Sequence, residues 1–275
     1  MTVHSDWGEW LPAAIERADP DGIAVWYLGC NGFALKANDG TTLFIDPYLG
    51  TGDPPRTIRM IPVPFAPEDV RAADAVLSTH EHTDHTHGPS QAPILSGTDA
   101  SFYGPAAAVD IAETWTDAHG VDGDDITEIA PSETVDVGSL SIRVERANDP
   151  DAETPVSYVI EHDSKTFFHA GDARSSEAFE DVGRRYDIDL AAVAFGSSGM
   201  IPDKETREPT HTTWYADENT AAEAAQQLRA DRLLPTHWDM WKGLTADPSA
   251  LRDHVRSFEY PRTLEILEIG DRTAV

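Results

Sequence analysis

The feature that most constrains this chain is a cluster of histidines that begins where a short apolar segment ends. Four of the eleven histidines fall within eight residues, in the run His80-Glu-His82-Thr-Asp84-His85-Thr-His87. The apolar residues at 75–79 predict a short buried strand, and active groups commonly follow such strands in α/β folds. Alternate side chains of an extended chain point to one side, so His80, His82 and Asp84 converge. A turn after them would bring His85 to the same place.

The donor types in this cluster indicate a metal centre. Neutral imidazole and carboxylate groups suit zinc, manganese or iron. Their number exceeds what one tetrahedral site takes from so short a segment, so the sequence predicts two divalent ions. The alternative is a solvated histidine-rich loop in an acidic protein, but this spacing after an apolar strand is far more specific than a lone histidine pair.

The cluster resembles the signature of the metallo-β-lactamase fold superfamily. That resemblance implies a fold of the α/β class, a four-layer αββα sandwich with two metal ions in a groove at one edge of the sheets. It places His80 and His82 on the first ion, and Asp84 and His85 on the second.

Other segments are similar to the L-ascorbate-6-phosphate lactonase family within that superfamily. They carry the sequences WYLGCNGFALK, IDPYL and RMIPVPF at residues 26–36, 45–49 and 59–65, and PTHWDMW at 235–241. The likeness extends over nearly the whole chain. It implies that His237 binds the second ion; the alternative is a core histidine between Leu234 and Trp238.

Two further positions complete the expected ligand set. Asp172 follows Gly171 at a strand end and matches the bridging carboxylate of the resembled superfamily, with a helix N-cap as the alternative. The third histidine of the first ion is missing, and Asn148 is the best match to it, with Asp149 next. Because an amide oxygen is a weaker and harder donor than imidazole, the first site is expected to be weak or to hold a harder ion such as manganese.

The expected chemistry is metal-dependent hydrolysis. A water or hydroxide held by the two ions would attack an ester, lactone or phosphoester, with Asp84 orienting or deprotonating it. The resemblance suggests an L-ascorbate-6-phosphate-type lactone. Asp46 is a candidate for orienting a ligand histidine. Candidates for holding an anionic substrate are Arg174, Ser197, Ser198 and His211.

Two other functions stay open at this stage. One is a phosphodiesterase or nuclease of the same fold, which the acidic surface disfavours. The other is a catalytically impaired metal-binding regulatory protein, which the asparagine at 148 leaves open.

The charge balance bears on partners and environment. The chain has 49 acidic and 20 basic residues and a net charge of −29. The acids are dispersed rather than gathered in a tail, which favours adaptation to high salt over binding of a basic partner. Either way, a surface that follows a phosphate backbone is disfavoured, so no nucleic-acid partner is expected.

The organisation of the chain is expected to be simple. Residues 1–275 should form one hydrolase domain, with a short helical extension at about 1–20 that packs on the body or on another subunit of a homo-oligomer. No membrane-spanning run or signal peptide is apparent, so a cytoplasmic protein is expected. Cys30 is the only cysteine, from which we expect neither an intramolecular disulfide nor a cysteine-based zinc site.

Overall fold

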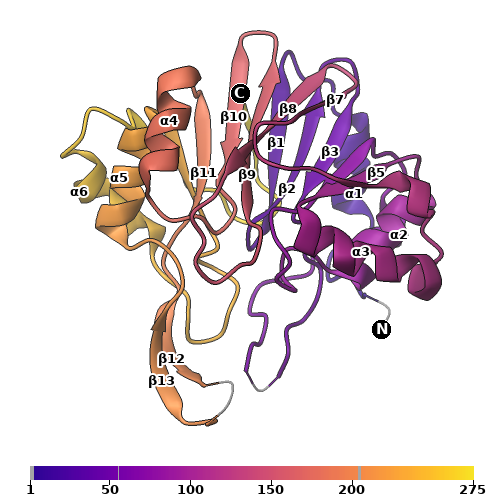
Figure 1. Cartoon of the computed structure of the whole chain (residues 1–275), viewed down its shortest axis with the longest axis horizontal. Coiled ribbons are helices and arrows are strands. Elements are labelled where there is room, and N and C mark those ends of the chain that lie inside the picture. Colours follow the sequence, from indigo (N-terminus) through magenta and orange to yellow (C-terminus); the bar gives the residue numbers. More distant parts are fainter. Residues whose placement is uncertain (1–2, 55, 204–205) are drawn as a thin grey trace.

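Two seven-stranded β-sheets pack face to face in the computed structural model, which describes residues 3–54, 56–203 and 206–275 (Figure 1). The first sheet has the order β16-β1-β2-β3-β4-β5-β6. Its strands are β1 (Ile23–Gly29), β2 (Gly32–Ala37), β3 (Thr42–Ile45), β4 (Ala75–Leu77), β5 (Ser101–Gly104), β6 (Ile126–Glu128) and β16 (Arg272–Ala274).

The second sheet has the order β15-β14-β11-β10-β9-β8-β7. Its strands are β7 (Thr134–Val137), β8 (Leu140–Arg146), β9 (Val156–His162), β10 (Lys165–His169), β11 (Leu190–Ala194), β14 (Arg232–Thr236) and β15 (Thr263–Leu264). A separate hairpin of β12 (Ser198–Pro202) and β13 (Pro209–Thr213) projects from the body beside the chain segment around residues 50–60 (Figure 1).

Strand β1 shows why the sequence gives two covered faces. All seven of its residues are buried. Val25 and Tyr27 belong to the core between the sheets, whereas Ala24 and Trp26 belong to the core under the helices. A strand covered on both faces is apolar at nearly every position, as this one is.

Helices cover the two outer faces. The first sheet is covered by α1 (Trp10–Arg17), α2 (Gly88–Gly97) and α3 (Ala106–His119), and the second by α4 (Glu177–Arg185), α5 (Glu218–Leu228) and α6 (Leu251–Val255). The αββα sandwich expected from the resemblance is therefore confirmed. No described helix is long and apolar enough to cross a membrane.

The N-terminal helix packs on the body of this chain. Its Leu11 and Ile15 side chains are buried in the core under the helices. The Lys36 ammonium group donates to the carbonyl oxygens of Ile15 and Glu16 at 3.1 and 2.6 Å, near the helix C-terminus. The helix itself covers Trp10–Arg17 of the helical extension expected at about 1–20. Residues 1–2 of the expected extension lie outside the described part of the chain.

The sheet topology brings strand ends from both sheets to one edge. β3, β4 and β5 are mutually parallel in the first sheet, and β10, β11 and β14 are parallel in the second. The carboxyl ends of parallel strands meet at the same edge, where ligands bind in open α/β sheets. The loops that follow β4, β10 and β14 contain the motifs singled out in the sequence.

Candidate metal centre

Two histidine and two aspartate side chains form a first group at this edge. His80, His82, Asp149 and Asp172 each place one donor atom within 4.8 Å of the others. His80 Nε2 lies 3.9 Å from Asp149 Oδ2 and 3.8 Å from Asp172 Oδ2. These two separations are longer than hydrogen bonds and suit donors that surround one ion, whereas His80 Nε2 lies 3.0 Å from His82 Nδ1. We call this the first metal position.

A second group lies beside it and shares Asp172. His85 Nε2 is 3.2 Å from Asp172 Oδ2, and His237 Nε2 is 3.8 Å from Asp172 Oδ1. His237 Nε2 also lies 3.3 Å from Asp84 Oδ2. Asp172 Oδ2 thus faces His80 of the first group and His85 of the second, which suits a carboxylate shared between the two positions. We call this the second metal position, held by Asp84, His85, Asp172 and His237.

Two buried donor atoms in the centre lack hydrogen-bond partners among the described residues. They are Nε2 of His85 and Oδ2 of Asp149, on side chains that are almost fully shielded from solvent. An unpaired buried polar atom costs about 1 to 3 kcal/mol. A divalent cation at each position would satisfy both atoms, so the residues present fit a two-metal centre.

Asp46 orients the His85 ring at the second position from the side opposite the ion. Its carboxylate lies 2.8 Å from His85 Nδ1 and accepts from the Thr79 amide and hydroxyl at 2.8 and 2.7 Å. A carboxylate on one ring nitrogen fixes the tautomer that leaves the other nitrogen facing the ion.

The electrostatics of the centre keep its carboxylates ionised. Burial opposes ionisation of Asp84 and Asp172, but the His85 and His237 rings hold the pKa of each carboxyl below its usual value. Burial and the neighbouring His85 lower the pKa of His80 to about 3, so its imidazole is neutral, the form that binds metals.

His85 behaves differently from His80. Burial alone would lower the pKa of His85, but the carboxylates of Asp172 and Asp46 raise it well above its ordinary value. In the absence of an ion, this imidazolium therefore balances the surrounding negative charge. Metal and proton compete for His85 Nε2.

The residue that completes the first position is Asp149, not Asn148. The Asn148 side chain is exposed, and the main-chain carbonyl oxygen of Asn148 accepts from the Arg174 main-chain amide at 2.9 Å. Asp149 is buried and contributes its carboxylate to the group. Burial and the nearby Asp172 raise the pKa of Asp149. The structure thus places Asp149, the second candidate from the sequence, in the first group, and the ligand assignment at this position stays a prediction.

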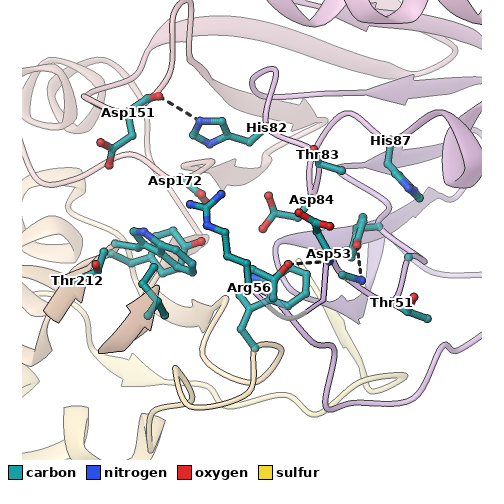
Figure 2. A pocket seen from close by; sticks show the side chains of 18 of the residues that line it. Thr51, Asp53, Arg56, His82, Thr83, Asp84, His87, Asp151, Asp172 and Thr212 are labelled. Atoms are coloured by element: carbon teal, nitrogen blue, oxygen red, sulfur yellow. Dashed lines mark hydrogen bonds between the residues drawn. The ribbon is translucent and has the colours of Figure 1, made fainter. Parts of the chain in front are cut away.

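The two metal positions form the floor of a cavity of about 1030 Å³ (Figure 2). His82, Asp84, Asp149 and Asp172 line the floor. The walls come from the N-terminal segment, the loop at 48–57, the β12–β13 hairpin and the segment that follows β14; their lining residues include His4, Tyr48, Thr51, Thr210, Thr212 and Trp241. The volume suits a small molecule.

None of the four residues expected to hold the substrate lines this cavity. The Arg174 guanidinium donates to Asp151 and to the Trp214 carbonyl, both at 3.1 Å. The buried Ser197 hydroxyl donates to the His237 carbonyl at 3.0 Å. Ser198 and His211 are exposed and lie 3.2 Å apart on the hairpin, whose other face lines the cavity. Local contacts occupy each of these side chains or turn it away from the cavity, and their role in substrate binding stays a prediction.

Arg56, which the sequence did not single out, is the cationic residue that faces the centre. Its guanidinium points from the 48–57 loop toward Asp84 and Asp172 (Figure 2). Its side chain forms no hydrogen bond or ion pair with the described residues, and its Nε is buried and unpaired. Arg59 holds the base of the same loop through bonds to the Tyr48 and Pro62 carbonyls at 2.9 and 2.7 Å.

Two buried side chains lie beside His237. The Tyr215 hydroxyl lies 2.8 Å from His237 Nε2, and the two rings stack with centroids 4.1 Å apart. Cys30 Sγ lies 3.2 Å from the same nitrogen. This thiol is grouped with Asp84 and His237.

Comparison with known proteins agrees with this fold. The family described as Beta-lactamase superfamily domain matches residues 41–238. The chain therefore belongs to the metallo-β-lactamase superfamily and is a metal-dependent hydrolase of that superfamily.

Individual relatives show what the chain is similar to within this superfamily. A probable L-ascorbate-6-phosphate lactonase from Escherichia fergusonii is 29% identical, with 92% of this chain and 80% of the relative covered. The metallo hydrolase Igni18 from Ignicoccus hospitalis superposes with a TM-score of 0.67 at 21% identity, covering 91% of this chain and 97% of that one. A possible metal-dependent hydrolase from Veillonella parvula gives a TM-score of 0.70 at 15% identity, covering 92% and 99%.

Proposed function

We propose that residues 1–275 form one two-metal hydrolase domain that acts on a small anionic ester, lactone or phosphoester. The observation that carries this proposal is the set of unpaired, buried donor atoms at the floor of a cavity. The similarity to a probable L-ascorbate-6-phosphate lactonase supports a phosphorylated sugar-acid lactone as the substrate class.

The chain's own donors define what each position holds. His80, His82, Asp149 and Asp172 would hold the first ion, and Asp84, His85, Asp172 and His237 the second. Divalent ions such as zinc or manganese would supply Lewis-acid chemistry to the reacting groups.

Asp84 is the proposed proton acceptor. Its carboxylate lines the cavity, and the His85 and His237 rings keep its pKa low despite burial, so it is ionised at neutral pH. A proton from the attacking water would go to Asp84 Oδ1, because Oδ2 faces His237.

Tyr215 supplies a hydroxyl group on the same side. It lines the cavity, and burial and the nearby Asp172 raise the pKa of its phenol well above the ordinary value. The phenol is therefore neutral. Its hydroxyl lies 2.8 Å from His237 Nε2 and would be free to donate to bound substrate once that nitrogen binds an ion.

Arg56 is the proposed anchor for the substrate's negative charge. The chain carries 29 net negative charges, yet this guanidinium is paired with none of the described carboxylates. A planar guanidinium binds carboxylate or phosphate oxygens in bidentate fashion. We infer that its partner is an anionic substrate group lying above the metal positions.

The test compares three substrates and two arginine variants. L-ascorbate 6-phosphate should be hydrolysed in preference to the matched unphosphorylated lactone and to bis(p-nitrophenyl) phosphate. Arg56→Met should raise KM for the phosphorylated lactone about 10- to 100-fold, because one charge-assisted contact is lost. The effect on KM for the neutral lactone should be smaller.

Arg174→Met is the matched control, because Arg174 is bound to Asp151 and lies outside the cavity wall. It should change KM by less than about threefold. Turnover of bis(p-nitrophenyl) phosphate without turnover of any lactone would instead support a phosphodiesterase.

A further inference from the structure

Cys30 occupies a constrained turn next to the second metal position. It lies between β1 and β2, is fully buried, and has a left-handed backbone with φ of 60°. Its carbonyl oxygen accepts from the His237 amide at 2.7 Å and from the Tyr27 hydroxyl at 2.9 Å. His237 also has a left-handed backbone, with φ of 62°. Direct hydrogen bonding thus fixes the backbones of these two residues relative to each other.

The distances around the thiol match ligand separations about one ion. Cys30 Sγ lies 3.2 Å from His237 Nε2 and 3.7 Å from Asp84 Oδ2, and those two atoms are 3.3 Å apart. Zinc has bonds of about 2.3 Å to sulfur and about 2.0 to 2.2 Å to nitrogen or oxygen, and it accepts five ligands as well as four. At five-coordinate angles of about 90° to 120°, neighbouring ligand atoms are about 2.9 to 3.8 Å apart. All three sides of the observed triangle lie close to these values.

A buried free cysteine more often serves as a small apolar side chain. Cys30 does contact apolar neighbours, including Tyr48 and Met240. Its sulfur, however, also faces two of the residues that hold the second position. An independent feature also points to an ion there. The fully buried His85 Nε2 groups with Asp172 and His237 and lies 3.2 Å from Asp172 Oδ2, but it makes no hydrogen bond with any described residue.

We propose that Cys30 is an additional ligand of the second metal position, where its thiolate joins Asp84 and His237. This inference rests on the proposed two-metal centre and adds to it a preference of the second position for one kind of metal ion. A thiolate favours zinc over harder ions such as manganese, whereas the first position offers only imidazole and carboxylate donors. On metal binding the thiol proton passes to solvent. The two positions therefore differ in the ion they prefer.

Cobalt provides a direct test, because Co²⁺ replaces zinc and gives a sulfur-to-cobalt charge-transfer absorption when a thiolate is bound. Metal-free protein titrated with Co²⁺ should develop this band. Cys30→Ser should lose the band while still binding cobalt. His82→Ala is the matched control; it removes a first-position ligand and should keep the band.

Competition with a chelator gives a second readout. Cys30→Ser should weaken zinc binding at the second position by about 10- to 100-fold and leave manganese binding nearly unchanged. Thermal melting of the metal-free variants establishes that each is folded.

The possible failures are distinguishable. In one outcome, the wild-type protein binds cobalt and His237→Ala binds less, but no sulfur band appears. That outcome would overturn the role of Cys30 and would leave the proposed metal centre intact. Absence of cobalt and zinc binding altogether would overturn both this inference and the proposed function.

Discussion

Asp46 Oδ2 lies 2.8 Å from Nδ1 of His85, and both side chains are completely buried. The contact aims the unpaired Nε2 of His85 at the second metal position. The carboxylate comes from the end of β3 and the histidine from the loop after β4, two parallel neighbours in the first sheet. The sheet itself therefore sets the direction of a metal ligand.

Asp46→Asn should weaken metal binding at the second position by about 10- to 100-fold, because an amide is a poorer partner for the ring N–H and leaves the imidazole less basic. The measurement is zinc affinity by chelator competition. Asp53→Asn is the control; Asp53 lies on the cavity wall, is exposed, and should leave affinity unchanged. Equal affinities for all three proteins would show that Asp46 does not orient the ligand.

Metal binding should release protons at neutral pH. The carboxylates of Asp172 and Asp46 raise the pKa of His85 above its ordinary value of 6.5 despite its burial, so an ion must displace a proton from Nε2. Affinity at the second position should therefore fall as the pH is lowered. Calorimetric titrations in buffers with different ionisation enthalpies measure the number of protons released. Heats that do not depend on the buffer would contradict a protonated His85.

His85 also links pH to the stability of the metal-free protein. Its pKa is higher in the folded state than in the unfolded state, so its contribution to stability is fully present below pH 6.5. That contribution is lost as the pH rises through the folded-state pKa. His85→Asn should remove this part of the pH dependence from metal-free melting curves.

Asp149→Ala should remove close to one metal ion per chain, whereas Asn148→Ala should remove none. The first substitution deletes a buried carboxylate of the first position, and the second changes an exposed side chain. Elemental analysis after gel filtration measures the difference. The reverse result, with loss only in the Asn148 variant, would restore the amide as the ligand.

Salt should stabilise this protein markedly. A net charge of −29 on 275 residues produces self-repulsion, which molar salt screens over about 3 Å. The thermal midpoint should therefore rise from dilute buffer to molar KCl. A midpoint that stays constant across the series would argue that the acidic residues serve a binding partner rather than a saline environment.

The parts of the centre that sequence reasoning located are those determined by local pattern. His80, His82, Asp84 and His85 lie in one segment after one apolar strand, and the structure gathers them at that strand's end. The αββα layers follow from strands that are apolar on both faces.

Residues that depend on tertiary structure or on an irregular backbone were either missed, as Cys30 and Arg56 were, or ranked second, as Asp149 was. Cys30 meets His237 across 207 residues of sequence, and no local period connects them. Asn148 and Asp149 are neighbours in the loop after β8, where no strand pattern determines which side chain turns inward. Arg56 lies outside the helices and strands, and its role became visible only through the cavity it enters.

The central claim is that this chain holds two metal ions through distinct sets of ligands. Metal content per chain, measured by elemental analysis in wild-type protein never exposed to chelator and in His82→Ala and His237→Ala, tests it most directly. The expected result is close to two ions in the wild type and close to one in each variant, because His82 serves the first position and His237 the second. Wild-type protein that binds no metal, or single variants that both lose every ion, would contradict the two-position account.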